Sequence, residues 1–130
     1  MDIPAGLQGE ARTRVSPENT AAAVGSGALP VFGTPYMVAL MEKAAMESVQ
    51  PYLEPGKGTV GTRLDISHDA ATPLGMEVRA VSTLTAVEGR RLSFRVEAFD
   101  ETGPIGSGTH ERFVIDEQRF MDKCAAKLSR

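Results

Sequence analysis

The fold is decided by the stretch TPYMVALMEKAAMESVQPYL, residues 34–53. Its apolar residues recur at intervals of three and four, which is the spacing of a helix with one broad buried face. These positions are Met37, Val38, Leu40, Met41, Ala44, Ala45 and Val49. Thr34 is predicted to cap the helix and Pro35 to take its first helical position, while Pro51 marks its exit. The stretch therefore predicts one long helix buried against other structure.

Downstream of this helix the apolar spacing changes to a period of two, which is typical of a half-buried strand. Alternation assigns to one face Val60, Thr62, Leu64, Ile66 and His68. It assigns to the other face Thr59, Gly61, Arg63, Asp65 and Ser67. Further strands are predicted over residues 76–87, 91–98 and 105–115, joined by turns, and a short charged helix over residues 117–128.

One long helix followed by antiparallel strands is an α+β arrangement, in which the helix covers one face of the sheet. A chain of 130 residues is near the commonest domain size, so a single domain over residues 1–130 is expected. Residues 15–32, before the helix, are rich in Ala, Gly and Ser and show little periodicity. We expect them to form a loop or a loosely helical lid over one end of the molecule.

The composition argues against several classes of protein. Apolar residues make up 42% and charged residues 24% of the chain, as in ordinary soluble domains. A formal net charge of −3 and a pI near 5.4 provide no basic field, so nucleic acid is not expected as a partner. No apolar run is long enough for a signal-peptide core or a membrane span, so we expect no membrane partner and a cytoplasmic location.

Cysteine and histidine are scarce. Cys124 is the only cysteine, which rules out a disulfide within one chain and fits a reducing compartment. The two histidines, His68 and His110, lie far apart in the sequence, and no metal site can be read from them. We therefore expect neither a metal nor another cofactor.

Three residues could carry chemistry, and each also has a purely structural interpretation. Glu42 lies within the apolar helix, where a carboxylate often marks only the edge of the buried face. His68 ends an apolar strand face, where a histidine is more often a hydrogen-bonded core residue than a catalyst. Thr34 stands at a helix start and could serve only as its cap. Residue type alone leaves both interpretations open.

A series of short motifs in a fixed order favours the chemical interpretation. They are VFGTP (31–35), LME (40–42), TVGT (59–62), ATPLG (71–75) after His68, GRRLSF (89–94) and IGSGTHER (105–112). Together they resemble the fluoroacetyl-CoA thioesterase-like family of hot-dog proteins, and the resemblance extends over residues 15–127. It implies a hot-dog fold, in which an antiparallel β-sheet wraps around one long central helix.

The resemblance implies a catalytic set. By order and spacing, Thr34, Glu42 and His68 match the threonine, glutamate and histidine that act together in the family. These residue types suit thioester hydrolysis, which needs an activated nucleophile, a proton relay and donors for the developing oxyanion. The sequence does not decide whether Thr34 or a water molecule attacks first. Phe32 and Met37 flank Thr34, so we expect them to border the acyl pocket, together with residues 15–29.

Two more positions match residues that the family places near the acyl group. They are Gly61 and Arg112. Each has a simpler alternative, since Gly61 could only relieve crowding on its strand and Arg112 could pair with Glu111 or Asp116.

The spacing of Thr34 and Glu42 poses a geometric question. They are eight positions apart (34 to 42), which corresponds to about 12 Å along one helix, too far for a direct bond. Either the chain bends before Pro35, or side chains from two subunits complete the site. Members of the family form dimers with active sites at the subunit interface, so the resemblance implies a homodimer.

The function implied is that of an acyl-CoA thioesterase, which hydrolyses a small acyl-CoA to the free acid and coenzyme A. The enzyme specialised for fluoroacetyl-CoA carries aromatic residues in a lid before the catalytic threonine, whereas residues 25–30 here, GSGALP, have none. We therefore expect a general short-chain acyl-CoA. Two alternatives are a non-catalytic acyl-CoA-binding module and a hot-dog enoyl-CoA hydratase or dehydratase. The hydratases usually carry an aspartate and histidine pair on the helix, and residues 34–53 contain no histidine.

Overall fold

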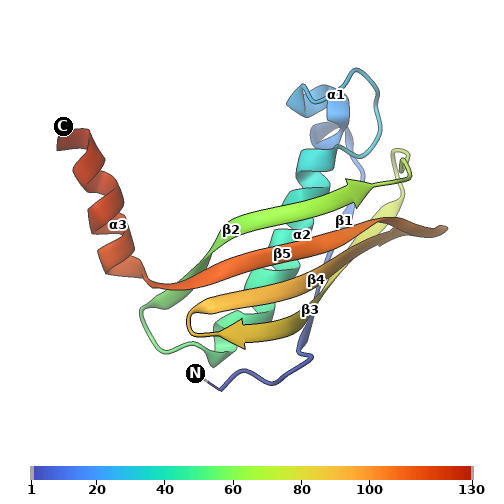
Figure 1. Ribbon diagram of the computed structural model, residues 1–130. Coiled ribbons are helices and arrows are strands. Elements are labelled where there is room, and N and C mark those ends of the chain that lie inside the picture. The colour runs from blue at the N-terminus through green and yellow to red at the C-terminus, as the bar shows by residue number, and fades with distance from the viewer. Residues whose placement is uncertain (1, 130) are drawn as a thin grey trace.

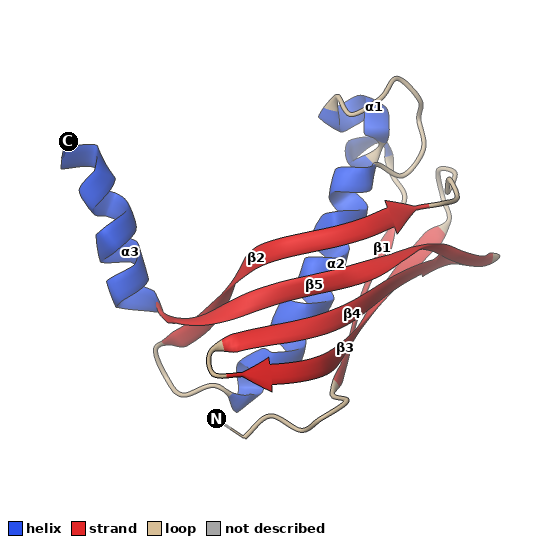
Figure 2. Ribbon diagram, in the orientation of Figure 1, coloured by secondary structure: helices blue, strands red, loops and turns tan. Residues whose placement is uncertain are grey.

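The computed structural model describes residues 2–129 and shows an antiparallel sheet curled around one long helix (Figure 1). The strands are β1 (Gln8–Arg14), β2 (Lys57–His68), β3 (Glu77–Glu88), β4 (Arg91–Asp100) and β5 (Gly103–Asp116). The helices are α1 (Ala21–Val24), α2 (Thr34–Val49) and α3 (Glu117–Ala125), with short 3-10 turns at Pro17–Asn19, Gln50–Tyr52 and Ala126–Ser129 (Figure 2). The strand order is β1-β3-β4-β5-β2, so β2 is one edge of the sheet.

The long predicted helix is confirmed as α2, and its apolar face is buried against the sheet. Buried side chains along it are Met37, Leu40, Met41, Ala44, Ala45 and Val49. The prediction for its first residue was wrong. Gly33 is the N-cap, Thr34 is already helical, and no side chain caps this end. The hydroxyl of Thr34 is bonded elsewhere, as described below.

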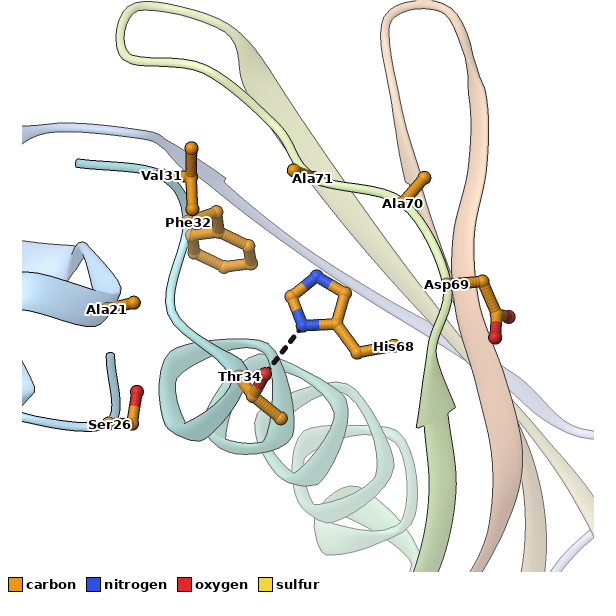
Figure 3. A pocket seen from close by; sticks show the side chains of 9 residues that line it. All are labelled: Ala21, Ser26, Val31, Phe32, Thr34, His68, Asp69, Ala70 and Ala71. Carbon is orange, nitrogen blue, oxygen red and sulfur yellow. Dashed lines mark hydrogen bonds between the residues drawn. The ribbon is translucent and has the colours of Figure 1, made fainter. Parts of the chain in front are cut away.

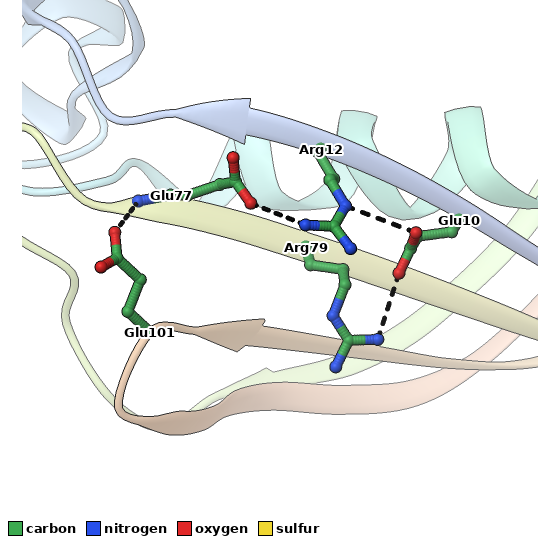
Figure 4. A network of polar contacts seen from close by, with 5 residues as sticks. All are labelled: Glu10, Arg12, Glu77, Arg79 and Glu101. Atoms are coloured by element: carbon green, nitrogen blue, oxygen red, sulfur yellow. Dashed lines mark hydrogen bonds and ion pairs between the residues drawn. The ribbon is translucent and has the colours of Figure 1, made fainter.

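β1 was not predicted, because its residues, QGEARTR, carry almost no apolar signal. Only Ala11 is buried, and the small inward positions let α2 pack closely against this strand. β1 pairs with β3, and ion pairs cross between them on the outer face (Figure 4). Arg12 contacts Glu77 at 2.8 Å, and Arg79 contacts Glu10 at 3.2 Å. These exposed pairs contribute little stability individually, so backbone pairing is the main reason the strand forms.

The predicted faces of β2 are wrong for its first half, because a bulge interrupts the alternation. The register shifts between Gly61 and Arg63, so Gly61 pairs with Arg112 while Leu64 pairs with His110. Directly paired residues of antiparallel strands point to the same face. Gly61 therefore lies on the helix-facing side together with Leu64, and an unbroken alternation would have separated them.

Two segments flank the ends of the sheet. Residues 15–32 fold as short helical turns at the N-terminal end of α2, close to the predicted lid, and are tied down by the isolated bridges Thr20↔Phe32 and Val31↔Pro73. At the other end, α3 projects away from the sheet and buries none of its residues (Figure 1). Asp116 caps α3 by accepting a hydrogen bond from the amide of Arg119 at 3.0 Å.

Candidate active site

Thr34 and His68 meet where the end of β2 passes the start of α2. The hydroxyl of Thr34 lies 2.7 Å from Nδ1 of His68, and Figure 3 shows the two side chains pointing toward each other. Thr34 is the first residue of α2 and His68 is the last residue of β2, so the fold and not the local sequence brings them together. They lie at the edge of an open pocket of about 230 Å³. Its other lining residues are Ala21, Ser26, Val31, Phe32, Asp69, Ala70 and Ala71.

Hydrogen bonds to residues distant in sequence hold the pocket wall at Phe32 in place. Phe32 is 1% exposed, and its amide donates to the carbonyl of Thr72 at 2.9 Å. The buried hydroxyl of Thr72 donates in turn to the carboxylate of Asp100 at 2.8 Å. Phe32 thus borders this pocket. Met37 does not line it, because it is completely buried and packs beside Gly106 in the core.

The environment of His68 favours a neutral imidazole. Burial lowers the pKa of His68 below its ordinary value, and the nearby carboxylate of Asp69 opposes this only in part. Nε2 is buried and has no hydrogen-bond partner among the described residues. A neutral ring whose Nδ1 faces a hydroxyl is suited to accept a proton from that hydroxyl.

A second polar cluster gathers the other predicted site residues. Nη1 of Arg112, on β5, lies 3.3 Å from Oε2 of Glu42, on α2. Gly61, on β2, borders the same carboxylate, and a Cβ there would lie 2.5 Å from Oε2 of Glu42. Gly61 therefore leaves the space that the Glu42 carboxylate occupies. The Glu42 side chain is still 41% exposed, so it remains within reach of a ligand.

Arg112 is held from several sides. It is 6% exposed, and its guanidinium donates from Nε to the hydroxyl of Thr59 at 2.8 Å and from Nη2 to the Thr59 carbonyl at 3.0 Å. The alternative partners are engaged elsewhere, since Glu111 pairs with Arg91 and Asp116 with Lys57. Burial lowers the pKa of Arg112, and the charge of Glu42 partly offsets it.

The two clusters do not meet within one chain. Thr34 and Glu42 belong to one continuous helix, so a bend before Pro35 does not bring them together. Eight residues of α helix correspond to about 12 Å. The structure thus groups Thr34 with His68, and Glu42 with Gly61 and Arg112.

Two further features are absent from residues 2–129. No group of three or more His, Cys, Asp or Glu side chains in this range is arranged to hold a metal ion. No helix in the same range is long and apolar enough to cross a membrane.

Solved structures define the class. A solved structure of the fluoroacetyl-CoA thioesterase FlK superposes with a TM-score of 0.91 and 41% identity, covering 98% of both chains. A thioesterase superfamily member from Thermus thermophilus gives a TM-score of 0.89 and 33% identity, covering 98% of this chain and 94% of that one. The curled sheet around α2 is therefore that of a hot-dog thioesterase.

Sequence comparison narrows this class to a family. The family described as fluoroacetyl-CoA-specific thioesterase matches residues 15–118. The fluoroacetyl-CoA thioesterase of Streptantibioticus cattleyicolor is 52% identical over 97 residues, which cover 75% of this chain and 70% of that protein. The chain belongs to the fluoroacetyl-CoA-specific thioesterase family, and it is a thioester hydrolase.

His110 and Thr59 complete the Arg112 cluster, and neither was predicted from the sequence to take part in the chemistry. His110 is 1% exposed and lies 3.2 Å from Nη1 of Arg112. The period-two spacing of His110 and Arg112 on one predicted strand was a usable signal, because it places both side chains on one face. Thr59 could not have been found this way, since its partner lies 53 positions away in the chain.

Proposed function

We propose that this protein hydrolyses the thioester bond of a small acyl-CoA through Thr34, His68 and Glu42. The observation that carries the proposal is the 2.7 Å contact between the Thr34 hydroxyl and Nδ1 of His68 at an open pocket. A neutral imidazole in this position accepts a proton as the attacking oxygen bonds to the thioester carbonyl carbon. The C–S bond then breaks, and the thiolate leaves with a proton as coenzyme A.

The same geometry serves either attacking group. If Thr34 attacks, its proton passes to His68 and water hydrolyses the acyl-threonine in a second step. If water attacks, Thr34 orients it and His68 takes its proton directly. The start of α2 adds the positive end of a helix dipole, which favours the negative charge on the carbonyl oxygen. Rapid-quench detection of an acyl group on Thr34 distinguishes the two routes.

Acyl binding is assigned to Phe32, Gly61 and Arg112. Phe32 forms an apolar wall beside Thr34, and the missing side chain of Gly61 leaves room beside the carboxylate of Glu42. Arg112 supplies a positive charge next to Glu42, partly shielded from water. A small acyl group fits this combination of one aromatic wall and a narrow polar cradle.

A homodimer completes the site in this proposal. Thr34 and Glu42 stand about 12 Å apart along α2, so one thioester cannot touch both in a single copy. Two copies related by a twofold axis would bring Thr34 and His68 of one protomer toward Glu42 of its partner, and such pairing generates two equal sites. We further propose that residues 1–130 act as one domain and that the protein is cytoplasmic, which its single cysteine favours.

The substrate proposed is a general short-chain acyl-CoA. FlK and the relative from Streptantibioticus cattleyicolor are named for fluoroacetyl-CoA, but residues 25–30 here contain no aromatic side chain that could shape a fluorine-selective lid. Thiol release across a panel of acetyl-, fluoroacetyl-, propionyl- and longer acyl-CoAs tests this. The proposal expects turnover of several short acyl groups, and a strict requirement for fluorine would contradict it.

A further inference from the structure

His110 forms a buried pair with Arg112 on β5, and the proposed reaction gives His110 no role. His110 is 1% exposed and stacks on Phe94, with ring centroids 6.0 Å apart. The two residues are two positions apart on one strand, so both side chains face α2. Because water does not reach His110, its ring nitrogens must find partners within the protein.

The partners of His110 define which ring nitrogen carries the hydrogen. Nδ1 lies 2.8 Å from the carbonyl oxygen of Arg63, an atom that can only accept, so Nδ1 carries the hydrogen. Nε2 lies 3.2 Å from Nη1 of Arg112, which can only donate, so Nε2 offers its lone pair. A doubly protonated ring would direct an N–H at the guanidinium. His110 is therefore a neutral imidazole in its Nδ1–H form.

The charges around His110 agree with this form. Burial is the main cause that lowers the pKa of His110, and the positive charge of Arg112 lowers it further. The carbonyl of Arg63 and the carboxylates of Glu42 and Glu111 act in the opposite direction without overcoming burial. The lone pair on Nε2 is thus present at neutral pH.

The lone pair on Nε2 of His110 accepts one of the hydrogens of the Arg112 guanidinium. A guanidinium has five N–H groups. Two of them, on Nε and Nη2, are held by Thr59. The two on Nη1 go to His110 at 3.2 Å and to Glu42 at 3.3 Å. Nη1 of Arg112 therefore serves both His110 and Glu42. The direction of its bond to His110 sets the direction of its bond to Glu42.

We propose that His110 is a positioning residue for thioester hydrolysis, whose Nε2 lone pair orients Arg112 and, through it, the carboxylate of Glu42. The inference rests on the function proposed above for Glu42 and Arg112. β2 contributes through its bulge, because the carbonyl that fixes the ring belongs to Arg63, directly after the register shift. Loss of the lone pair leaves the buried guanidinium with an unmatched N–H, and only its two bonds to Thr59 then hold its direction toward Glu42.

Two amide variants of His110 distinguish the roles of its two ring nitrogens. His110→Gln places an amide oxygen near the position of Nε2 and so keeps an acceptor for Arg112. His110→Asn places an amide nitrogen near Nδ1, which keeps the donor to Arg63 but removes that acceptor. We expect kcat to fall by about tenfold or more in His110→Asn and by only about threefold in His110→Gln, with KM changing less than kcat in both. Equal losses in the two variants, or none, would overturn the inference.

Two further measurements distinguish a positioning role of His110 from a folding defect and from a failure of the proposed function. In a double-mutant cycle, adding His110→Asn to Glu42→Gln should reduce kcat no further, whereas independent, additive losses would contradict positioning through Glu42. Nitrogen-15 NMR of the wild-type imidazole reports the ring state without any variant or substrate. A hydrogen on Nδ1 alone at neutral pH supports the inference, and a hydrogen on Nε2 refutes it. A wild-type protein with the expected ring state that releases no thiol from any acyl-CoA would instead refute the proposed function.

Discussion

The hydroxyl of Thr34 and Nδ1 of His68 are 2.7 Å apart, although 34 positions separate these residues in the chain. This contact explains why Thr34 is not the helix cap that the sequence predicts. Gly33 takes the N-cap position, and the hydroxyl turns away from the helix amides toward the imidazole. The helix start is thus left without a side-chain cap, and the Thr34 hydroxyl contacts His68 instead of a helix amide.

Gly61→Ala should reduce hydrolysis by about tenfold or more with little effect on unfolding free energy. The added Cβ would lie 2.5 Å from Oε2 of Glu42 and 3.3 Å from Nη1 of Arg112, so the carboxylate has to move. Gly58→Ala on the same strand is the matched control, because its Cβ meets only the flexible end of Glu117 at 3.2 Å. Equal activity in the two variants would mean that the space beside Glu42 is unimportant.

The rate should decline on the acid side with an apparent pKa below 6.5. Burial lowers the pKa of His68 below its ordinary value, so the imidazole stays unprotonated and able to act as a base to lower pH. Asp69 raises the same pKa, and Asp69→Asn should shift the decline to still lower pH. The measurement is kcat/KM against pH, repeated in His110→Gln to remove the second buried imidazole. A shift to higher pH in Asp69→Asn would contradict the role of His68.

Thr72→Val should cost about 1 kcal/mol of unfolding free energy at neutral pH, because it removes the hydrogen bond to Asp100. Burial raises the pKa of Asp100, but hydrogen bonds from Thr102 and Thr72 outweigh it, and the net pKa is lowered from 3.8. Because the pKa of Asp100 is lower in the folded state than in the unfolded state, the ionised carboxylate stabilises the fold above pH 3.8. This stability is lost as the pH falls through the pKa of Asp100 in the folded protein.

Urea unfolding of this variant at neutral and acid pH checks both statements. The cost of Thr72→Val should shrink once Asp100 is protonated. Thr85→Val is the control, because its hydroxyl bonds an exposed backbone carbonyl at 3.1 Å and no carboxylate. A cost that is the same at both pH values would show that Asp100 is not the relevant partner.

Mixing two inactive variants tests the shared site. If Thr34 and Glu42 act across a twofold interface, a dimer of one Thr34→Ala and one Glu42→Gln subunit has one intact site and one doubly altered site. Random exchange of subunits should then restore about a quarter of the wild-type rate. Light scattering verifies the dimer, and Thr34→Ala mixed with His68→Ala is the control, since these two residues act in the same protomer. No recovery in the first mixture, or a fully active monomer, would refute a shared site.

The sequence was sufficient for the elements with a strong apolar period. Met41 and Val49 on α2, and Phe94 and Val96 on β4, lie buried as their spacing predicts. β1 escaped prediction because its inward residues are small and its outward residues charged, so neither period stands out.

The site was only partly predictable for a different reason. A bulge reverses the faces of a strand without leaving a distinctive residue at Thr62, so Gly61 was assigned to the wrong side. The carboxylate that pairs with Arg112 is that of Glu42, 70 positions away. From the sequence, the nearer carboxylates of Glu111 and Asp116 were equally plausible partners. Motif order pointed to Thr34, Glu42 and His68 as candidates, but which of them lie together depends on how β2 and β5 pack against α2.

Thr34 and His68 are proposed to act together on a thioester, and the decisive experiment measures turnover and thermal stability in the same variants. Thiol release from the best acyl-CoA should fall by about a hundredfold or more in Thr34→Ala and in His68→Ala, and no further in the double variant. Thermal midpoints should change little, because Thr34 does not cap α2 and His68 lies beside an open pocket. Near-normal turnover in His68→Ala, or a lost rate explained by a lowered midpoint, would rule out joint catalysis by Thr34 and His68.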